Sequence, residues 1–182
     1  MSSVRGFPSA GSRPAAFVAD GAVAAVLLGW AVVAAGIGWW LLPMAYLAAA
    51  TPQLVRVDLA EHRLPNVLTL PGYPVALVAI AGTALTGRSV LTPLVAGAAY
   101  LGVLFLAHLG GGMGMGDVKL AGVLGATLGM GGPSTALAGL ALAVLIGGAV
   151  ATVLLLRGRR GSRLAFGPYL LLGFWLALAW SG

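Results

Sequence analysis

The stretch TALAGLALAVLIGGAVATVLLL, residues 135–156, contains no charged side chain. An apolar helix of about 20 residues is long enough to cross the hydrocarbon core of a bilayer. Similar apolar runs recur along the 182-residue chain, which is 60% hydrophobic and only 8% charged. Soluble domains usually contain about 25% charged residues, so this chain has too few polar groups to cover a globule in water. The sequence therefore predicts an all-α, polytopic bundle of transmembrane helices.

About seven membrane spans are expected, with an uncleaved first helix rather than a signal peptide, because that apolar run is long and further spans follow it. Residues 1–16 are rich in Ser, Gly and Pro and are expected to form a disordered cytoplasmic tail. Residues 17–182 are expected to form a single transmembrane domain. The predicted spans are 17–37, 39–55, 67–85, 90–109, 118–130, 135–156 and 164–180.

The basic residues predict the orientation of these spans. The most basic loop is 157–163, and Lys and Arg gather in cytoplasmic loops. Placing this loop in the cytoplasm also makes the N terminus cytoplasmic and puts segments 56–66 and 110–117 on the same side. Of the 10 cations, only Arg88 then lies on the opposite side. The net charge of +6 is thus accounted for by topology and contact with lipid phosphates, without a nucleic acid partner.

Two of the chain's 4 acidic residues meet in this topology. Asp58 ends the second span and Asp117 begins the fifth, so both lie at the predicted cytoplasmic edge. Ionisable groups at membrane depth are costly, and are functional or paired with a cation. Asp58 could pair with Arg56 or Arg63, and Asp117 could serve as a helix-start acid. Alternatively, two neighbouring carboxyls share one proton, so that one accepts a proton from water and the other polarises a carbonyl.

Glycines precede Asp117 in GGGMGMGDVKL, residues 110–120. Because Gly lacks a Cβ atom, a second backbone can approach closely, and an extended peptide substrate would fit beside Gly114 and Gly116. The alternative is helix packing through small residues, which is common in membranes. Lys119, the only lysine, is expected to stabilise the ionised state of the aspartate pair or to orient Asp117; the alternative is that it extends towards lipid head groups.

Three segments together resemble the prepilin peptidase family of GxGD-type intramembrane aspartyl proteases. VDLAEHRLPNVLT (57–69) and GMGDVKL (114–120) match its two aspartate motifs, and LAFGPYLLLG (164–173) is similar to its F-G-P segment. The resemblance implies that Asp58 and Asp117 are the catalytic pair. It also implies supporting or substrate-binding roles for Gly114, Gly116, Lys119, Pro65, Asn66, Gly167 and Pro168.

The same resemblance implies cleavage of a membrane-anchored prepilin or pseudopilin-like protein at the cytoplasmic face of the bacterial cytoplasmic membrane. No cofactor or metal is expected. Family members often carry a large loop with paired cysteines, but this chain has no Cys, and Ala165 replaces a proline of the family pattern. The chain thus resembles a short, single-domain peptidase, and methylation of the new N terminus stays open, as do the individual substrate and the oligomeric state.

Other functions are compatible with the same residues. Asp58, Glu61 and His62 are spaced closely enough to hold a metal, although the protease reading already uses Asp58. A small transporter would use the two aspartates as a proton relay, but a relay places its acids near the midplane or in a chain across it. A purely structural assembly subunit would tolerate Asp-to-Asn changes. Presenilin-like proteases share only the GxGD motif and a partner aspartate, and the LPNVLT segment favours the prepilin class.

Overall fold

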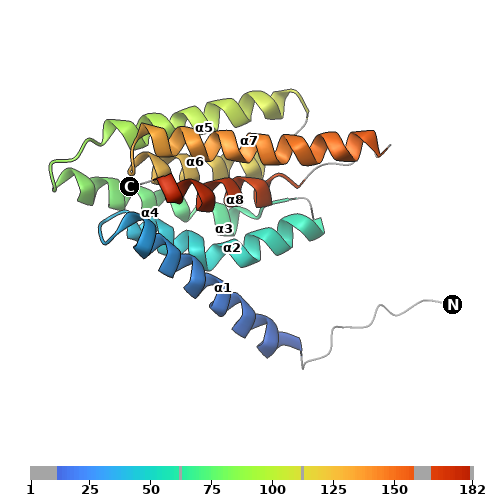
Figure 1. Cartoon of the computed structure of the whole chain (residues 1–182), viewed down its shortest axis with the longest axis horizontal. Coiled ribbons are helices and arrows are strands. Elements are labelled where there is room, and N and C mark those ends of the chain that lie inside the picture. Colours follow the sequence, from blue (N-terminus) through green and yellow to red (C-terminus); the bar gives the residue numbers. More distant parts are fainter. Residues whose placement is uncertain (1–11, 62, 112, 158–164, 181–182) are drawn as a thin grey trace.

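The computed structural model describes residues 12–61, 63–111, 113–157 and 165–180. Within these residues the chain is all-helical, as predicted (Figure 1). The helices are α1 (Ser12–Ala35), α2 (Leu41–Glu61), α3 (Asn66–Thr69), α4 (Gly72–Ala84), α5 (Leu91–Leu109), α6 (Met115–Gly129), α7 (Pro133–Leu156) and α8 (Gly167–Ala177), followed by the short 3-10 helix η1 (Leu178–Trp180).

Successive long helices run in alternating directions along the bundle (Figure 1). One end, on the right in Figure 1, gathers the last residues of α2 and α5 and the first residues of α6 and α8. We call it the aspartate end, because Asp58 and Asp117 belong to these helix termini. The far end gathers the connections from α1 to α2, from α4 to α5 and from α6 to α7. The alternation brings the two aspartates together, as the sequence predicts.

Four segments are long and apolar enough to cross a membrane: Ala16–Ala35, Asn66–Ala84, Leu91–Leu109 and Pro133–Leu154. Each overlaps a predicted span. Helix α8 is a shorter apolar helix, and α2 and α6 lie between these segments in the chain. The all-α class is therefore confirmed, whereas the number of crossings and the cytoplasmic N terminus stay predictions.

Several element boundaries differ from the predicted spans. The predicted span 67–85 is broken between α3 and α4, because Pro71 has no N–H to donate within a helix. Helix α2 continues to Glu61, beyond the predicted limit of 55, since its last residues include good helix formers. Helix α1 begins at Ser12, inside the predicted tail, and Pro14 is tolerated there because it lies in the first turn. The rest of that tail, 1–11, lies outside the described residues.

Helix α6 is the centre of the bundle. Most of its residues are buried, although it has only 15 residues. It approaches α5 closely through glycines: a Cβ atom on Gly125 would lie 2.7 Å from the carbonyl oxygen of Ala96, and one on Gly129 would lie 2.6 Å from Cα of Pro93. Such small-residue contacts let helices pack without a hydrophobic driving force from water. This packing fixes the position of Asp117 at the start of α6.

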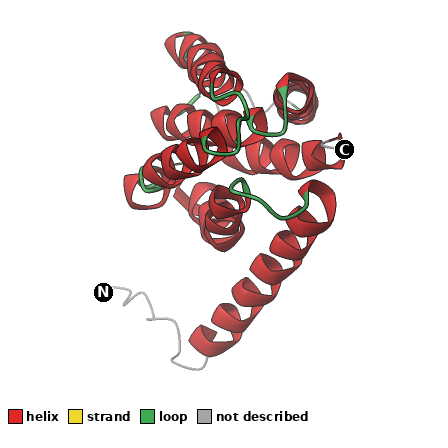
Figure 2. Cartoon of the chain, turned by 90° about the vertical axis from the view of Figure 1, so that its left-hand side faces the viewer, coloured by secondary structure: helices red, strands yellow, loops and turns green. Residues whose placement is uncertain are grey.

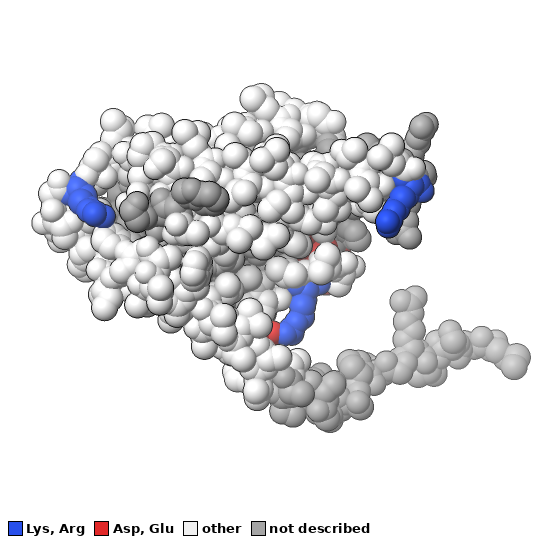
Figure 3. Space-filling model, viewed as in Figure 1, with Lys and Arg blue, Asp and Glu red and all other residues white. Residues whose placement is uncertain are grey.

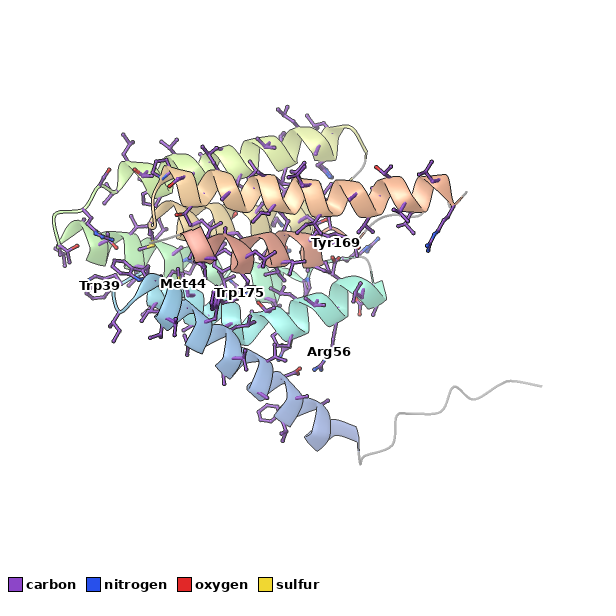
Figure 4. All side chains as sticks on the ribbon, in the orientation of Figure 1. Trp39, Met44, Arg56, Tyr169 and Trp175 are labelled. Atoms are coloured by element: carbon purple, nitrogen blue, oxygen red, sulfur yellow. The ribbon has the colours of Figure 1, made fainter. Side chains whose placement is uncertain are left out.

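Helix α1 diverges from the rest of the bundle (Figure 2). Towards the far end, the indole N–H of Trp30 donates to the carbonyl oxygen of Trp175 at 2.9 Å. Towards the aspartate end, α1 inclines away, and Arg56 of α2 forms an ion pair with Asp20 of α1. Figure 4 shows Arg56 between these two helices.

Candidate active site

Asp58 is buried in the last turn of α2, with only 2% of its surface exposed. Its Oδ2 atom accepts a hydrogen bond from the backbone N–H of Gly167, the first residue of α8, at 3.0 Å. The N-terminus of a helix favours negative charge. Arg56, one of the two cations considered as a partner of Asp58, forms an ion pair with Asp20. Asp58 is thus bound by the first residue of α8.

The absence of a side chain at Gly167 is required for this contact. A Cβ atom there would lie 2.7 Å from Oδ2 of Asp58 and 3.2 Å from Cδ1 of Leu64. Pro168 follows in the first turn of α8, where a missing N–H costs no intrahelical hydrogen bond. The Gly-Pro pair therefore begins α8 and leaves room for the carboxylate of Asp58.

Asp117 lies in the first turn of α6, with 5% of its surface exposed. Its Oδ2 atom accepts a hydrogen bond from the N–H of Gly114 at 3.2 Å, which caps the helix. Its Oδ1 atom is buried and has no hydrogen-bond partner among the described residues. The helix-start role is therefore present, yet it uses only one of the two carboxyl oxygens.

The two carboxyls interact at the same amide. Asp117 lies close enough to Asp58 and to the N–H of Gly167 for both to act on the pKa of its carboxyl, whereas the hydrogen bond of this N–H goes to Oδ2 of Asp58. Asp117 precedes the apolar stretch 118–130 that is expected to enter the membrane. Burial raises the pKa of its carboxyl, and the neighbouring Asp58 raises this pKa further. This arrangement favours one shared proton on the pair.

The segment between α2 and α4 is fixed beside the pair. Pro65 has an extended backbone and precedes Asn66, the first residue of α3. Lys119 donates a hydrogen bond from Nζ to Oδ1 of Asn66 at 2.9 Å, a contact that the sequence pattern does not indicate, while its roles at the aspartate pair stay predictions. The hydroxyl of Tyr73 donates to the carbonyl oxygen of Lys119 at 2.7 Å. These bonds join α3 and α4 to α6.

Gly116 packs against the segment that precedes α3, which leaves no space there for a substrate. A Cβ atom at this position would lie 2.8 Å from Cβ of Leu64 and 3.0 Å from its carbonyl oxygen. The space predicted for a substrate backbone at Gly116 is therefore filled by the segment that precedes α3. A Cβ atom on Gly114 would lie 3.3 Å from Oδ2 of Asp117, so the missing side chain leaves room for the carboxyl that this glycine's N–H binds. Gly111 is open, with no heavy atom within 4 Å of a Cβ placed there.

His108 contacts the connection before α6 rather than the aspartate pair. The Nδ1 atom of His108 lies 2.7 Å from the carbonyl oxygen of Met113, an interfacial contact of the kind expected for a lone histidine. His62 lies outside the described residues. Those that are described include no group of three His, Asp or Glu residues able to hold a metal ion.

The sequence pattern of the Type IV leader peptidase family matches residues 47–156. The chain belongs to this family. The matched region contains Asp58, Asp117 and the LPN segment, whereas Gly167 lies beyond it. Family membership makes the chain a leader peptidase-type protease, and its apolar helices identify a membrane protein. Comparison with curated proteins and with solved structures gave no match.

Some contacts at this candidate site are not visible in the sequence. The motifs identify Gly167, but not that its N–H binds Asp58 or that its missing Cβ makes room for the carboxylate. Tyr73 and Tyr46 were not predicted, although both brace the site, and the hydroxyl of Tyr46 donates to the carbonyl oxygen of Leu68 at 2.7 Å. A lone tyrosine in an apolar helix is ambiguous, since its partner is a backbone carbonyl that no motif marks.

Proposed function

We propose that this chain is an aspartic endopeptidase that uses Asp58 and Asp117 to remove the leader peptide of a type IV prepilin or pseudopilin-like substrate. The observation that supports it most is the meeting of two buried carboxyls from α2 and α6 at the single amide of Gly167. Structural carboxyls gain nothing from such proximity, because like charges repel. Two carboxyls that share a proton supply both the base and the acid for peptide hydrolysis.

The contacts suggest a division of roles within the pair. The N–H of Gly167 stabilises negative charge on Asp58, so the shared proton resides on Asp117, whose Oδ1 atom has no other partner in the described chain. Asp58 takes a proton from water as the water oxygen attacks the scissile carbonyl carbon. Asp117 gives its proton to the carbonyl oxygen, which forms a neutral tetrahedral intermediate.

Collapse of that intermediate completes the reaction. The carbonyl forms again as the C–N bond breaks, and the leaving nitrogen takes the proton that Asp58 received from water. The hydroxyl proton of the intermediate returns to Asp117. The pair regains its single proton, the leader peptide leaves with a carboxyl group, and the shortened protein leaves with a free amino group.

The position of the pair at one end of the bundle suits a substrate anchored in the membrane. We place the aspartate end at the cytoplasmic face of the bacterial cytoplasmic membrane, because this end holds the described cations Arg56, Arg63, Lys119 and Arg157. A prepilin-like substrate has its leader on that side, directly before its hydrophobic helix. Cleavage at this boundary needs carboxyls at the edge of the bilayer rather than at its midplane.

The same position argues against a proton relay. The chain has 4 acidic residues: Asp58 and Glu61 lie near the end of α2, Asp117 begins α6, and Asp20 contacts Arg56. None belongs to the far end, so no row of carboxylates crosses the bundle. A relay needs proton-carrying groups along the path.

Replacement of each aspartate tests the proposal. We expect Asp58→Asn and Asp117→Asn each to reduce processing of a co-expressed type IV prepilin by at least about 100-fold, the scale of lost acid or base catalysis. Glu61→Gln is the matched control, because Glu61 is exposed in the same turn of α2 as Asp58. The measurement is the ratio of processed to unprocessed prepilin at equal amounts of membrane-inserted enzyme. Normal cleavage by either Asn variant would refute the pair.

A further inference from the structure

A small cavity lies at the far end of the bundle, away from the two aspartates. Its volume is about 90 Å³, which admits a group of a few heavy atoms and is too small for an acyl chain. Trp39 and Met44 mark this region on the left in Figure 4. The residues that line the cavity and carry the argument below are Trp40, Arg88, Gly131 and Thr135.

A buried hydroxyl without a partner lines this cavity. Thr135 is 1% exposed, and its Oγ1 atom has no hydrogen-bond partner in the described part of the chain. The other buried threonines, for example Thr127 and Thr83, donate to a backbone carbonyl within their own helices. A buried hydroxyl left unpaired is unfavourable. The exception at Thr135 is therefore an unused donor beside the cavity.

A cation lines the same cavity. The guanidinium carbon of Arg88 lies 4.8 Å from the ring centroid of Trp40, a cation–π contact that orients the side chain. All four side-chain carboxylates belong to the other part of the molecule, so none of them neutralises Arg88. Figure 3 shows basic groups near both ends of the bundle, with most of the visible face uncharged. A guanidinium binds phosphate oxygens through parallel N–H donors.

The start of α7 is a third feature that favours binding of an anion in this cavity. Helix α7 has 24 residues and begins at Pro133, so Thr135 lies in its first turn. The N–H groups of a first turn have no carbonyl partner within their helix, and a helix N-terminus attracts anions. The unpartnered hydroxyl, the guanidinium and this helix start all favour an acceptor group that carries negative charge.

We propose that this cavity binds a phosphate group, with Arg88 and the hydroxyl of Thr135 as donors. An anionic phospholipid head group is the source that best fits the surroundings, because the exposed apolar side chains of Ile37, Leu85 and Leu91 belong to the connections at the same end. The phosphate occupies the cavity while the acyl chains stay outside along the helices. The inference does not depend on the proposed peptidase activity.

Lipid retention by the purified full-length chain tests this proposal. The probes are phosphatidylglycerol and, as a zwitterionic control, phosphatidylcholine, each exchanged into detergent micelles and quantified on the protein by native mass spectrometry. We expect one phosphatidylglycerol per chain and weaker retention of phosphatidylcholine. Arg88→Gln should weaken phosphatidylglycerol binding about tenfold, and Thr135→Val about fivefold, as expected for lost hydrogen bonds to a charged group.

Two further variants separate specific binding from general effects. Thr135→Ser keeps the hydroxyl and should bind like the unchanged protein, which distinguishes a lost donor from disturbed packing. Arg157→Gln removes an exposed cation at the end of α7, at the other end of the bundle, so it should lose only loosely attached lipid and keep the one phosphatidylglycerol retained at the cavity. Equal losses from Arg88→Gln and Arg157→Gln, or full retention by both Arg88→Gln and Thr135→Val, would overturn the proposal.

Competition with inorganic phosphate distinguishes a lipid head group from free phosphate as the ligand. If millimolar phosphate does not displace phosphatidylglycerol, the site belongs to the lipid head group. If phosphate displaces the lipid, and Arg88→Gln removes that competition, the same donors bind the free anion. Displacement that persists unchanged in Arg88→Gln would contradict the assigned donors.

Discussion

At the level of single residues, Gly167 determines where the carboxylate of Asp58 lies. Its N–H donates to Oδ2 of Asp58, and the same position has no room for a Cβ atom. One glycine thus provides a hydrogen bond and an open space at the same place. The pair of aspartates depends on both properties, because Asp117 interacts with the same N–H.

We predict that Gly167→Ala reduces prepilin processing by about 100-fold, because its Cβ atom would displace the Asp58 carboxylate, and a misplacement of about 1 Å can have that effect. Membrane insertion should be unchanged. The matched control is Gly148→Ala, since a Cβ atom there has no heavy atom within 4 Å. The measurement is initial processing rate in membranes that contain equal enzyme. A rate near that of Gly148→Ala would show that Asp58 tolerates displacement.

The protonation of Asp117 has a consequence for stability. Its pKa is raised in the folded protein by burial and by Asp58, so the folded state holds a proton that the unfolded state releases. This contribution is fully present below about pH 4, where an ordinary aspartate titrates, and is lost as pH rises through the raised pKa.

We therefore predict that Asp117→Asn unfolds at a higher temperature than the unchanged protein, and that the difference grows with pH. The neutral amide oxygen can still accept the hydrogen bond from Gly114, whereas the carboxylate must remain buried and charged. The measurement is thermal unfolding in detergent from acidic to alkaline pH. Glu61→Gln, at an exposed site, should show a constant difference. A constant difference for Asp117→Asn would mean that its pKa is not raised.

At the level of elements, α3 and α6 are joined beside the candidate active site. The side-chain bond from Lys119 to Asn66 and the contact between Gly116 and Leu64 both cross this junction. The LPN segment and the GxGD segment are far apart in sequence, yet they form one structural unit. The bond to Asn66 is compatible with the predicted role of Lys119 in orienting Asp117.

We predict that Lys119→Met and Asn66→Ala each lower processing by a few fold, because one exposed hydrogen bond contributes about 1 kcal/mol. The double variant should be no worse than the more impaired single variant, since both changes remove the same bond. The measurement is a double-mutant cycle on the processing rate. Additive losses would show that the two residues act separately, for example on the substrate.

Element positions were more predictable than element ends. Long apolar runs located the helices, because each needs about 20 apolar residues to cross a bilayer. The break at Pro71 and the extension of α2 to Glu61 depend on local backbone hydrogen bonds, which hydropathy does not report. Similarly, charge and topology brought Asp58 and Asp117 to one end, but the amide between them comes from α8, and hydrogen bonds to backbone groups leave little trace in a sequence.

At the level of the whole molecule, orientation can be measured directly. The chain has no cysteine, so single-cysteine variants need no altered background. We predict that Ser89→Cys, in the exposed connection between α4 and α5, reacts with a membrane-impermeant maleimide in intact spheroplasts. Glu61→Cys, exposed at the aspartate end, should react only after the membrane is opened. The reverse pattern would place the N terminus outside and contradict cleavage at the cytoplasmic face.

The contact between Asp58 and α8 also sets an order of events during synthesis. The ribosome makes Asp58 and Asp117 well before Gly167, and the N–H that binds Asp58 belongs to α8, the last α-helix of the described chain. A nascent chain that has inserted α2 and α6 therefore holds both aspartates without this hydrogen-bond donor. The aspartate pair proposed above acquires the N–H of Gly167 only when α8 docks, so we expect no cleavage before the bundle is assembled.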